Sequence, residues 1–92
     1  MIESFRHKGL KRFCQQDDRS KLPPDMVERI AVILAALDAA ATITAMNRPS
    51  FRLHRLKGNL RGFWAVTVRA NWRIVFRFED GKAFDVDLVD YH

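Results

Sequence analysis

The chain has 92 residues, of which 48% are hydrophobic, so we expect one globular domain over residues 1–92 rather than two. Its 16 lysines and arginines outnumber its 11 carboxylates, and the net charge of +5 favours a polyanionic partner. The single cysteine, Cys14, excludes an internal disulfide and indicates a reducing compartment. No second thiol or paired histidine spacing offers a metal site, and we predict no cofactor. Without a signal region or an apolar run of roughly 18 residues, we expect a cytoplasmic protein with no membrane association.

The first half of the chain predicts one short strand followed by helices. Residues 2–5 are the strand candidate, and residues 8–16 form a short helix. Its inward face is expected to carry Leu10, Phe13 and Cys14.

A longer helix follows a polar connector. The Pro23-Pro24 pair predicts its start, because proline is tolerated where the first N–H groups have no partner. Apolar residues at helical spacing predict that it continues to about Ala40. Thr42 is a candidate cap for one further turn through Met46.

From Ser50 the apolar period changes to two, which is typical of strands. Three alternating segments follow one another, at residues 51–54, 64–69 and 72–78. The Asp80-Gly81 dipeptide then predicts a tight reversal, and residues 84–88 predict a last strand. Short connections make neighbouring strands antiparallel. We therefore expect an α+β sandwich of two layers, in which an N-terminal strand and two to three helices pack on a mainly antiparallel sheet of four to five strands.

One face of this sheet is expected to be open and cationic. No carboxylate lies between Asp38 and Glu79, yet half of the chain's cations fall in this acid-free segment. RNA, DNA, an acidic protein or an anionic membrane would each be attracted. The tryptophans at 64 and 72 share the parity of buried aliphatic residues and are expected in the core. The cations that we expect to bind RNA are Arg48, Arg52, Arg55, Lys57, Arg69, Arg73 and Arg77.

Two histidines in this half of the chain, His54 and His92, suit proton transfer, because an unperturbed imidazole titrates at about 6.5. RNA can be cut without a metal when the 2′-hydroxyl attacks the adjacent phosphate, which requires a base, an acid and cations. Asp90 could orient an imidazole, and Tyr91 could stack on a base. Strict alternation gives Asp90 and His92 the parity of Leu88, so the three terminal residues share one site only if regular strand geometry ends after Val89.

Three segments resemble the HigB-type toxins of the RelE/ParE superfamily. They are Leu53-His54-Arg55-Leu56-Lys57-Gly58, Arg69-Ala70-Asn71-Trp72-Arg73-Ile74-Val75-Phe76 and Asp90-Tyr91-His92. The resemblance implies a RelE-like fold and a ribosome-dependent endonuclease that cuts mRNA in the A site. It also implies a HigA-type helix-turn-helix antitoxin, with operator DNA bound only through the complex. By the same resemblance His54, Asp90, Tyr91 and His92 are catalytic, and Lys57 and Arg73 are substrate contacts.

A non-catalytic function uses the same cationic face without the histidines. In this alternative the chain is a ParE-like toxin directed at gyrase, or an RNA-binding module, and His54 is an ordinary surface residue of a strand. New cuts in translated messages would favour the nuclease, whereas DNA damage with intact messages would favour the gyrase-directed toxin.

Overall fold

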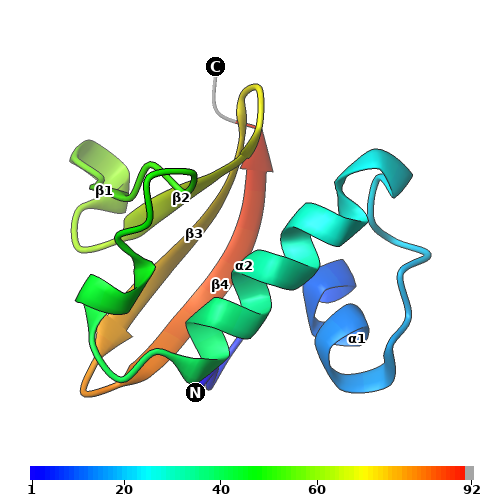
Figure 1. Ribbon diagram of the computed structural model, residues 1–92, viewed down its shortest axis with the longest axis horizontal. Helices are drawn as coiled ribbons and strands as arrows, with labels where there is room; N and C mark the ends of the chain where they lie inside the picture. The colour runs from blue at the N-terminus through cyan, green and yellow to red at the C-terminus, as the bar shows by residue number, and fades with distance from the viewer. Residues whose placement is uncertain (91–92) are drawn as a thin grey trace.

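The computed structural model describes residues 1–90. Four antiparallel strands form one sheet in the order β1-β2-β3-β4, and α2 crosses one of its faces (Figure 1). The predicted α+β architecture of helices packed on an antiparallel sheet is confirmed. The elements are α1 (Lys8–Gln16), η1 (Pro24–Met26), α2 (Val27–Ala39), η2 (Ile43–Met46), β1 (His54–Arg55), η3 (Gly58–Leu60), β2 (Trp64–Arg69), β3 (Trp72–Glu79) and β4 (Lys82–Asp90).

The N-terminal segment runs parallel to β4 as two isolated bridges, not as the regular strand predicted for residues 2–5. Ile2 is bridged to Ala83 and Phe5 to Val86. Four backbone hydrogen bonds of 2.8 to 3.1 Å join the two segments, including one from the N–H of Glu3 to the carbonyl of Ala83. The segment therefore covers the outer edge of β4, which would otherwise present unpaired backbone groups.

Helix α1 has the predicted bounds, and His7 caps it. The His7 Nδ1 atom accepts a hydrogen bond from the N–H of Leu10 at 3.1 Å. The helix packs tightly here, since a Cβ atom on Gly9 would lie 2.9 Å from the Cβ of Lys21. Leu10 is fully buried, but Cys14 is exposed, so its predicted place in the core is wrong. Cys14 lies instead on a groove between α1 and α2, where partial burial, and secondarily the charge of Asp38, raise the pKa of its thiol.

Helix α2 begins after the proline-led turn η1 and ends at Ala39, as predicted. Its buried side packs on the sheet through Ile30, Ile33 and Leu37. The predicted turn up to Met46 forms as η2, but the Thr42 side chain makes no capping hydrogen bond. Among residues 1–90, no helix combines the length and the apolar character that crossing a bilayer requires.

Strand β4 contains a bulge that changes which of its residues face the core. The reversal at Asp80-Gly81 forms as predicted, with both residues at positive φ. The register with β3 then shifts between Arg77 and Val75, where Asp85 of β4 adopts a left-handed backbone conformation. The extra residue places Ala83, Val86 and Leu88 in the main core. Phe84, which simple alternation assigns to the same side as Val86, lies only half-buried beside Arg77.

The segment before β1 is a turn and not the strand that its alternation predicts. Phe51 and Arg52 lie in the turn, Arg52 has a φ of 51°, and regular pairing begins only at His54. The Phe51 side chain is 1% exposed, and its carbonyl accepts a hydrogen bond from the N–H of Thr67. Burial of this one large ring holds the turn against α2 and β2, so it outweighs the local preference for a strand.

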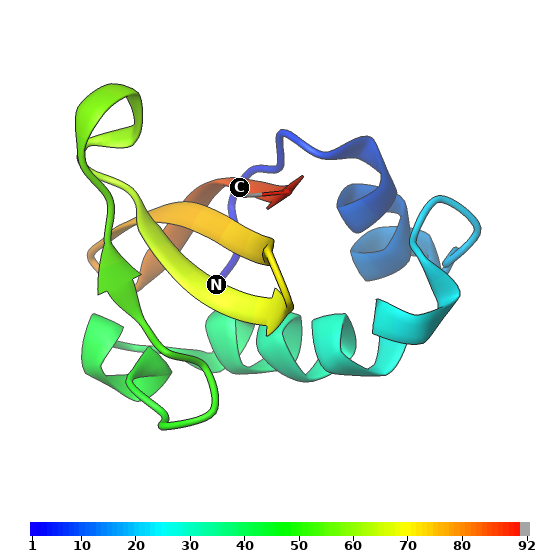
Figure 2. The same ribbon diagram turned by 90° about the horizontal axis from the view of Figure 1, so that it is seen from above.

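The face of the sheet away from α2 is partly covered, which corrects the sequence-based prediction of an open face. The connection between β1 and β2 folds back over it, closed by a 2.9 Å hydrogen bond from the N–H of Leu56 to the carbonyl of Phe63. Figure 2 shows the η3 turn of this connection on the side of the sheet opposite α2. The result is a second, smaller apolar cluster of Leu56, Phe63, Ala65 and Val75.

Candidate active site

The His54 side chain is exposed at the start of β1, and one of its two ring nitrogens is already bonded. Its Nδ1 atom lies 3.0 Å from the carbonyl oxygen of Arg52. Because a carbonyl only accepts, Nδ1 must carry the hydrogen in this contact. The left-handed backbone at Arg52 shapes the turn that brings this carbonyl to the ring. The other ring nitrogen, Nε2, makes no hydrogen bond within residues 1–90, which leaves it available for proton exchange.

The connection after β1, residues 56–63, carries further cations beside His54. Lys57 is exposed and stands at the start of the η3 turn, and Arg61 is exposed at its end. Gly58 and Gly62 adopt positive φ values of 69° and 93°, which allow the tight turn. Anchored by Leu56 and Phe63 in the second cluster, the connection holds its cations at a fixed edge of the sheet.

Arg73 lies half-buried on the same face of the sheet as Val75. One terminal nitrogen of its guanidinium donates to the carbonyls of Ala70 and Trp72 at 2.6 and 3.2 Å. Its Nε atom is buried and has no hydrogen-bond partner among residues 1–90. Arg73 is paired with Val89 on β4, so its guanidinium stands close to the end of that strand.

Two of the predicted RNA-binding arginines already have carboxylate partners. Arg69 forms an ion pair with Asp25 of η1. Arg77 donates to Asp85 at 3.0 Å and lies 3.7 Å from Glu79. Glu79 follows Arg77 by two residues, but Asp25 and Asp85 lie outside the acid-free segment and reach these arginines only through the fold.

Four other predicted cations are exposed, namely Arg48, Arg52, Arg55 and Lys57, and within residues 1–90 no carboxylate lies within ion-pair distance of them. Arg48 lies over the Phe51 ring, 5.1 Å from its centroid, and Arg55 lies 5.0 Å over Trp64. Arg52 is exposed in the turn before His54. These aromatic contacts orient the guanidinium groups but leave their charge uncompensated.

The structure does not bring Asp90 and His54 together. Asp90 is paired with Trp72, which packs against the main core, whereas His54 is paired with Ala65 of the second cluster. Paired residues share a face of the sheet, so the two side chains start from opposite faces. Their strands are also three spacings apart, or about 14 Å. Regular pairing continues through Asp90, and the predicted residues Tyr91 and His92 lie outside the described residues.

Sequence reasoning missed Arg6, which the fold adds to the face of the sheet that carries the second apolar cluster. Its guanidinium lies over the ring of Phe63, 5.1 Å from the centroid, although Arg6 belongs to the N-terminal segment beside β4. Only the parallel pairing of that segment with β4 brings it there, and no local pattern signals such a pairing.

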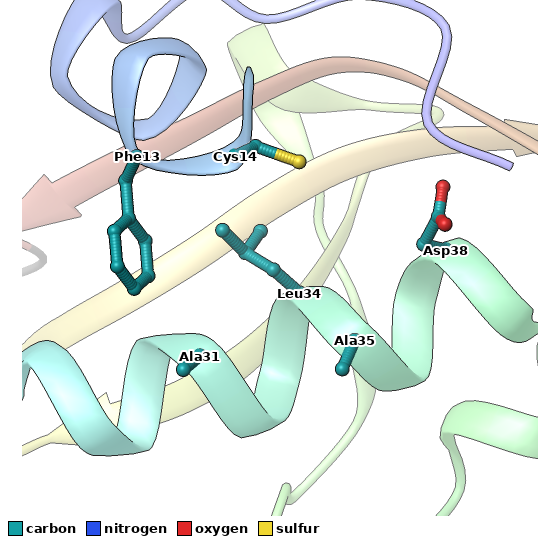
Figure 3. Close-up of a pocket in the computed structure, with 6 residues that line it drawn as sticks. All are labelled: Phe13, Cys14, Ala31, Leu34, Ala35 and Asp38. Atoms are coloured by element: carbon teal, nitrogen blue, oxygen red, sulfur yellow. The ribbon is translucent and has the colours of Figure 1, made fainter. Parts of the chain in front are cut away.

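A groove elsewhere on the surface contains none of the predicted site residues. It lies between α1 and α2, has a volume of about 200 Å³ and is largely apolar (Figure 3). The residues that line it are Phe13, Cys14, Ala31, Leu34, Ala35 and Asp38.

The fold is that of small bacterial toxins. The chain matches one chain of the heterotetrameric YoeB-YefM toxin-antitoxin complex from Staphylococcus aureus, with a TM-score of 0.62 at 22% identity, covering 100% of this chain and 95% of that one. It also matches a YafQ mutant from E. coli, with a TM-score of 0.64 at 13% identity, covering 98% of this chain and 91% of that one. These likenesses define the fold class, a two-layer toxin fold built on an antiparallel sheet.

Sequence comparison identifies the family. The model of the HigB-like toxins, described as the RelE-like toxin of the type II toxin-antitoxin system HigB, matches residues 3–92. Endoribonuclease HigB of Proteus vulgaris is 47% identical over 92 residues, covering 100% of both chains. Toxin HigB-1 of Vibrio cholerae is 32% identical over 90 residues, covering 96% of this chain and 95% of that one. The chain belongs to the HigB-like toxin family.

Proposed function

We propose that the chain is an endoribonuclease that cuts mRNA on the ribosome and so inhibits translation in the cytoplasm. Full-length similarity to a protein named Endoribonuclease HigB supports RNA cleavage. The single observation that carries the chemistry is the bonded Nδ1 of His54, which leaves Nε2 as the proton-exchanging atom beside a cationic loop.

The proposed reaction is an attack by the 2′-hydroxyl on the adjacent phosphorus. A base removes the 2′-hydroxyl proton, the new P–O bond closes a 2′,3′-cyclic phosphate, and the bond to the 5′-oxygen breaks as an acid protonates that oxygen. We assign these proton transfers to His54 and His92. Asp90 and Tyr91 complete the proposed catalytic set. Because Asp90 lies on the opposite face of the sheet from His54, we propose that it acts together with Tyr91 and His92 rather than with His54.

The cations divide into two groups in this proposal. Arg48, Arg52, Arg55, Lys57 and Arg73 contact the RNA backbone or the charge that develops on phosphorus, because each is without a carboxylate partner among residues 1–90. Arg69 and Arg77 hold the fold through their ion pairs and contribute less to RNA binding.

The proposed partners follow from the family. An antitoxin is encoded with a type II toxin, and we propose one of the HigA type with a helix-turn-helix domain, through which the complex binds operator DNA. The ribosome with mRNA in its A site is the proposed target, and we propose that the catalytic chemistry itself uses no metal.

Cleavage of mRNA on programmed ribosomes, mapped by primer extension, tests this function. Wild-type protein should cut within the translated region. The double variant Arg52→Gln/Lys57→Gln should raise KM several-fold and lower the log–log salt slope by about 1.4, since each single-strand phosphate contact contributes about 0.7.

The matched control is Arg69→Gln/Arg77→Gln, which removes the same net charge from residues that already have carboxylate partners. It should change KM much less. Equal effects of the two double variants would contradict the proposed division of cations. Uncut mRNA with wild-type protein, on and off the ribosome, would contradict the enzyme.

A further inference from the structure

Arg29, in the first turn of α2, is a half-buried cation outside both the acid-free segment and the candidate site. Within residues 1–90, no carboxylate lies at ion-pair distance from its guanidinium. A positive charge in the first turn of a helix opposes the helix dipole, so α2 itself gains nothing from this cation. The role of Arg29 must therefore lie in the contacts that its guanidinium makes.

The guanidinium of Arg29 joins the turn before β1 to strand β2. Its Nη2 atom donates to the carbonyl of Thr67 at 3.1 Å and also to the carbonyl of Ser50. This nitrogen carries two hydrogens, so both are used. The N–H of Thr67 donates in turn to the carbonyl of Phe51 at 2.8 Å. Two consecutive carbonyls of the turn are thus held at one residue of β2, one of them directly and the other through Arg29.

The same guanidinium stacks on the ring that anchors this turn. It lies 5.1 Å from the centroid of the Phe51 ring, which is 1% exposed. A cation over an aromatic face is attracted by the ring quadrupole, and more strongly where water is excluded. Arg29 therefore holds both the backbone and the side chain of the turn. The planar guanidinium suits this double contact, which an ammonium group reproduces only in part.

The backbone of this turn adopts an unfavourable conformation beside the candidate active site. Arg52 has a φ of 51°, in the left-handed region that residues with a Cβ atom rarely occupy. Such a conformation persists only where surrounding contacts enforce it. The Arg52 carbonyl is the group that lies 3.0 Å from the Nδ1 atom of His54. Because Ser50 precedes Arg52 by two positions, release of the Ser50 carbonyl would let the turn relax and move this acceptor.

We propose that Arg29 is a positioning residue for His54, which holds the turn of residues 50–52 on β2 and so keeps the Arg52 carbonyl in place to accept the Nδ1 hydrogen of the imidazole. The inference depends on the proposed function only in taking His54 as a proton-transfer group. The hydrogen bonds and the ring contact of Arg29 are all made within the protein. Arg29 therefore acts on His54 through the turn and not as a ligand of RNA.

The tautomer of His54 tests this role directly, measured from the nitrogen chemical shifts of its ring at a pH where the imidazole is neutral. In the wild-type chain the hydrogen should lie mainly on Nδ1. Arg29→Met keeps an unbranched stem of good helix propensity but removes the donors, so the hydrogen should move largely to Nε2, as in a free imidazole. Ser50 is exposed and Thr67 only half-buried, so water can satisfy the released carbonyls and the variant should fold.

Steady-state cleavage of mRNA on programmed ribosomes separates positioning from binding. Arg29→Met should lower kcat about 10- to 100-fold and leave KM within about two-fold of wild type, since a small misplacement of a catalytic group lowers the rate without weakening binding. Arg29→Lys retains a charged donor and should recover part of both the tautomer and the rate.

The control for lost stability is Leu34→Ala, on the side of α2 that faces α1. Leu34 is buried, so this variant should melt at a lower temperature. Below that temperature it should keep the wild-type tautomer of His54 and the wild-type kcat.

A stable Arg29→Met protein with the Nδ1 hydrogen and kcat of wild type would overturn the proposal and leave Arg29 a purely stabilising residue. A raised KM at unchanged kcat would also overturn it, because Arg29 would then contact RNA. An equal tautomer shift in Leu34→Ala would do the same, since the shift would follow from lost stability alone. If the wild-type chain cuts no RNA, the proposed function fails, whereas a tautomer shift confined to the Arg29 variants would still support positioning.

Discussion

Replacing His54 by alanine should slow RNA cleavage by about 10² to 10⁴-fold, the usual cost of losing a proton-transfer group. This corresponds to about 3 to 5 kcal/mol of activation free energy. The imidazole is exposed and bonded only to the carbonyl of Arg52 in the described structure, so the free energy of unfolding should change by less than about 0.5 kcal/mol. Single-turnover cleavage and a thermal melt of the same preparation separate the two effects.

The His7→Ala variant is the matched control, because His7 caps α1 and takes no part in the proposed chemistry. It should lower the free energy of unfolding by about 1 kcal/mol and leave the cleavage rate at the wild-type value. Cleavage by the His54→Ala protein at the parental rate would show that the proton transfers belong to other groups.

Replacing Phe51 by alanine should lower the free energy of unfolding by about 3 to 5 kcal/mol, because the ring is almost completely buried in the main core. The substitution also removes the ring on which Arg29 and Arg48 both stack, each 5.1 Å from its centroid. A domain of this size is typically stable by only about 5 to 10 kcal/mol. Urea denaturation should therefore show a large fall in the midpoint.

Phe51 also links stability to the candidate site, since its turn leads directly into His54. At temperatures where Phe51→Ala is still folded, we expect its cleavage rate to fall, because the Arg52 carbonyl is no longer held. Phe51→Leu keeps most of the apolar volume and should lose less than half as much stability. A loss below about 1 kcal/mol for Phe51→Ala would contradict its role in anchoring the turn.

The elements with strong local signals were predictable from the sequence. Helical spacing and the Pro23-Pro24 pair placed α2, and the alternation of residues 64–69 gave the bounds of β2 without error. The Asp80-Gly81 dipeptide located the β3–β4 reversal, because positive φ at both positions has a known residue preference. In these cases local sequence and tertiary packing favour the same structure.

The mispredicted features depend on contacts between distant residues. The bulge at Asp85 has no local signature strong enough to reverse the assignment of Phe84. The second apolar cluster forms because Leu56 and Phe63 close a connection over the sheet, which alternation within strands does not indicate.

The charges of the candidate site were also mispredicted, because they too depend on residues that are distant in the sequence. The absence of carboxylates between Asp38 and Glu79 is real in the sequence, yet Asp25 and Asp85 approach Arg69 and Arg77 in space. Conversely, Arg6 joins the cationic face from the far end of the chain. Proximity along the chain is thus a weak guide to which charges remain uncompensated.

Cleavage of an mRNA that carries one 2′-deoxynucleotide on the 5′ side of the scissile phosphate tests the proposed chemistry most directly. If the 2′-hydroxyl is the nucleophile, that position should remain uncut on the ribosome. The all-ribose message should be cut there to leave a 2′,3′-cyclic phosphate or its hydrolysed product. Cutting of the deoxy-substituted message at the same position and rate, with a 3′-hydroxyl end, would contradict a reaction in which His54 exchanges a proton with the substrate's own hydroxyl.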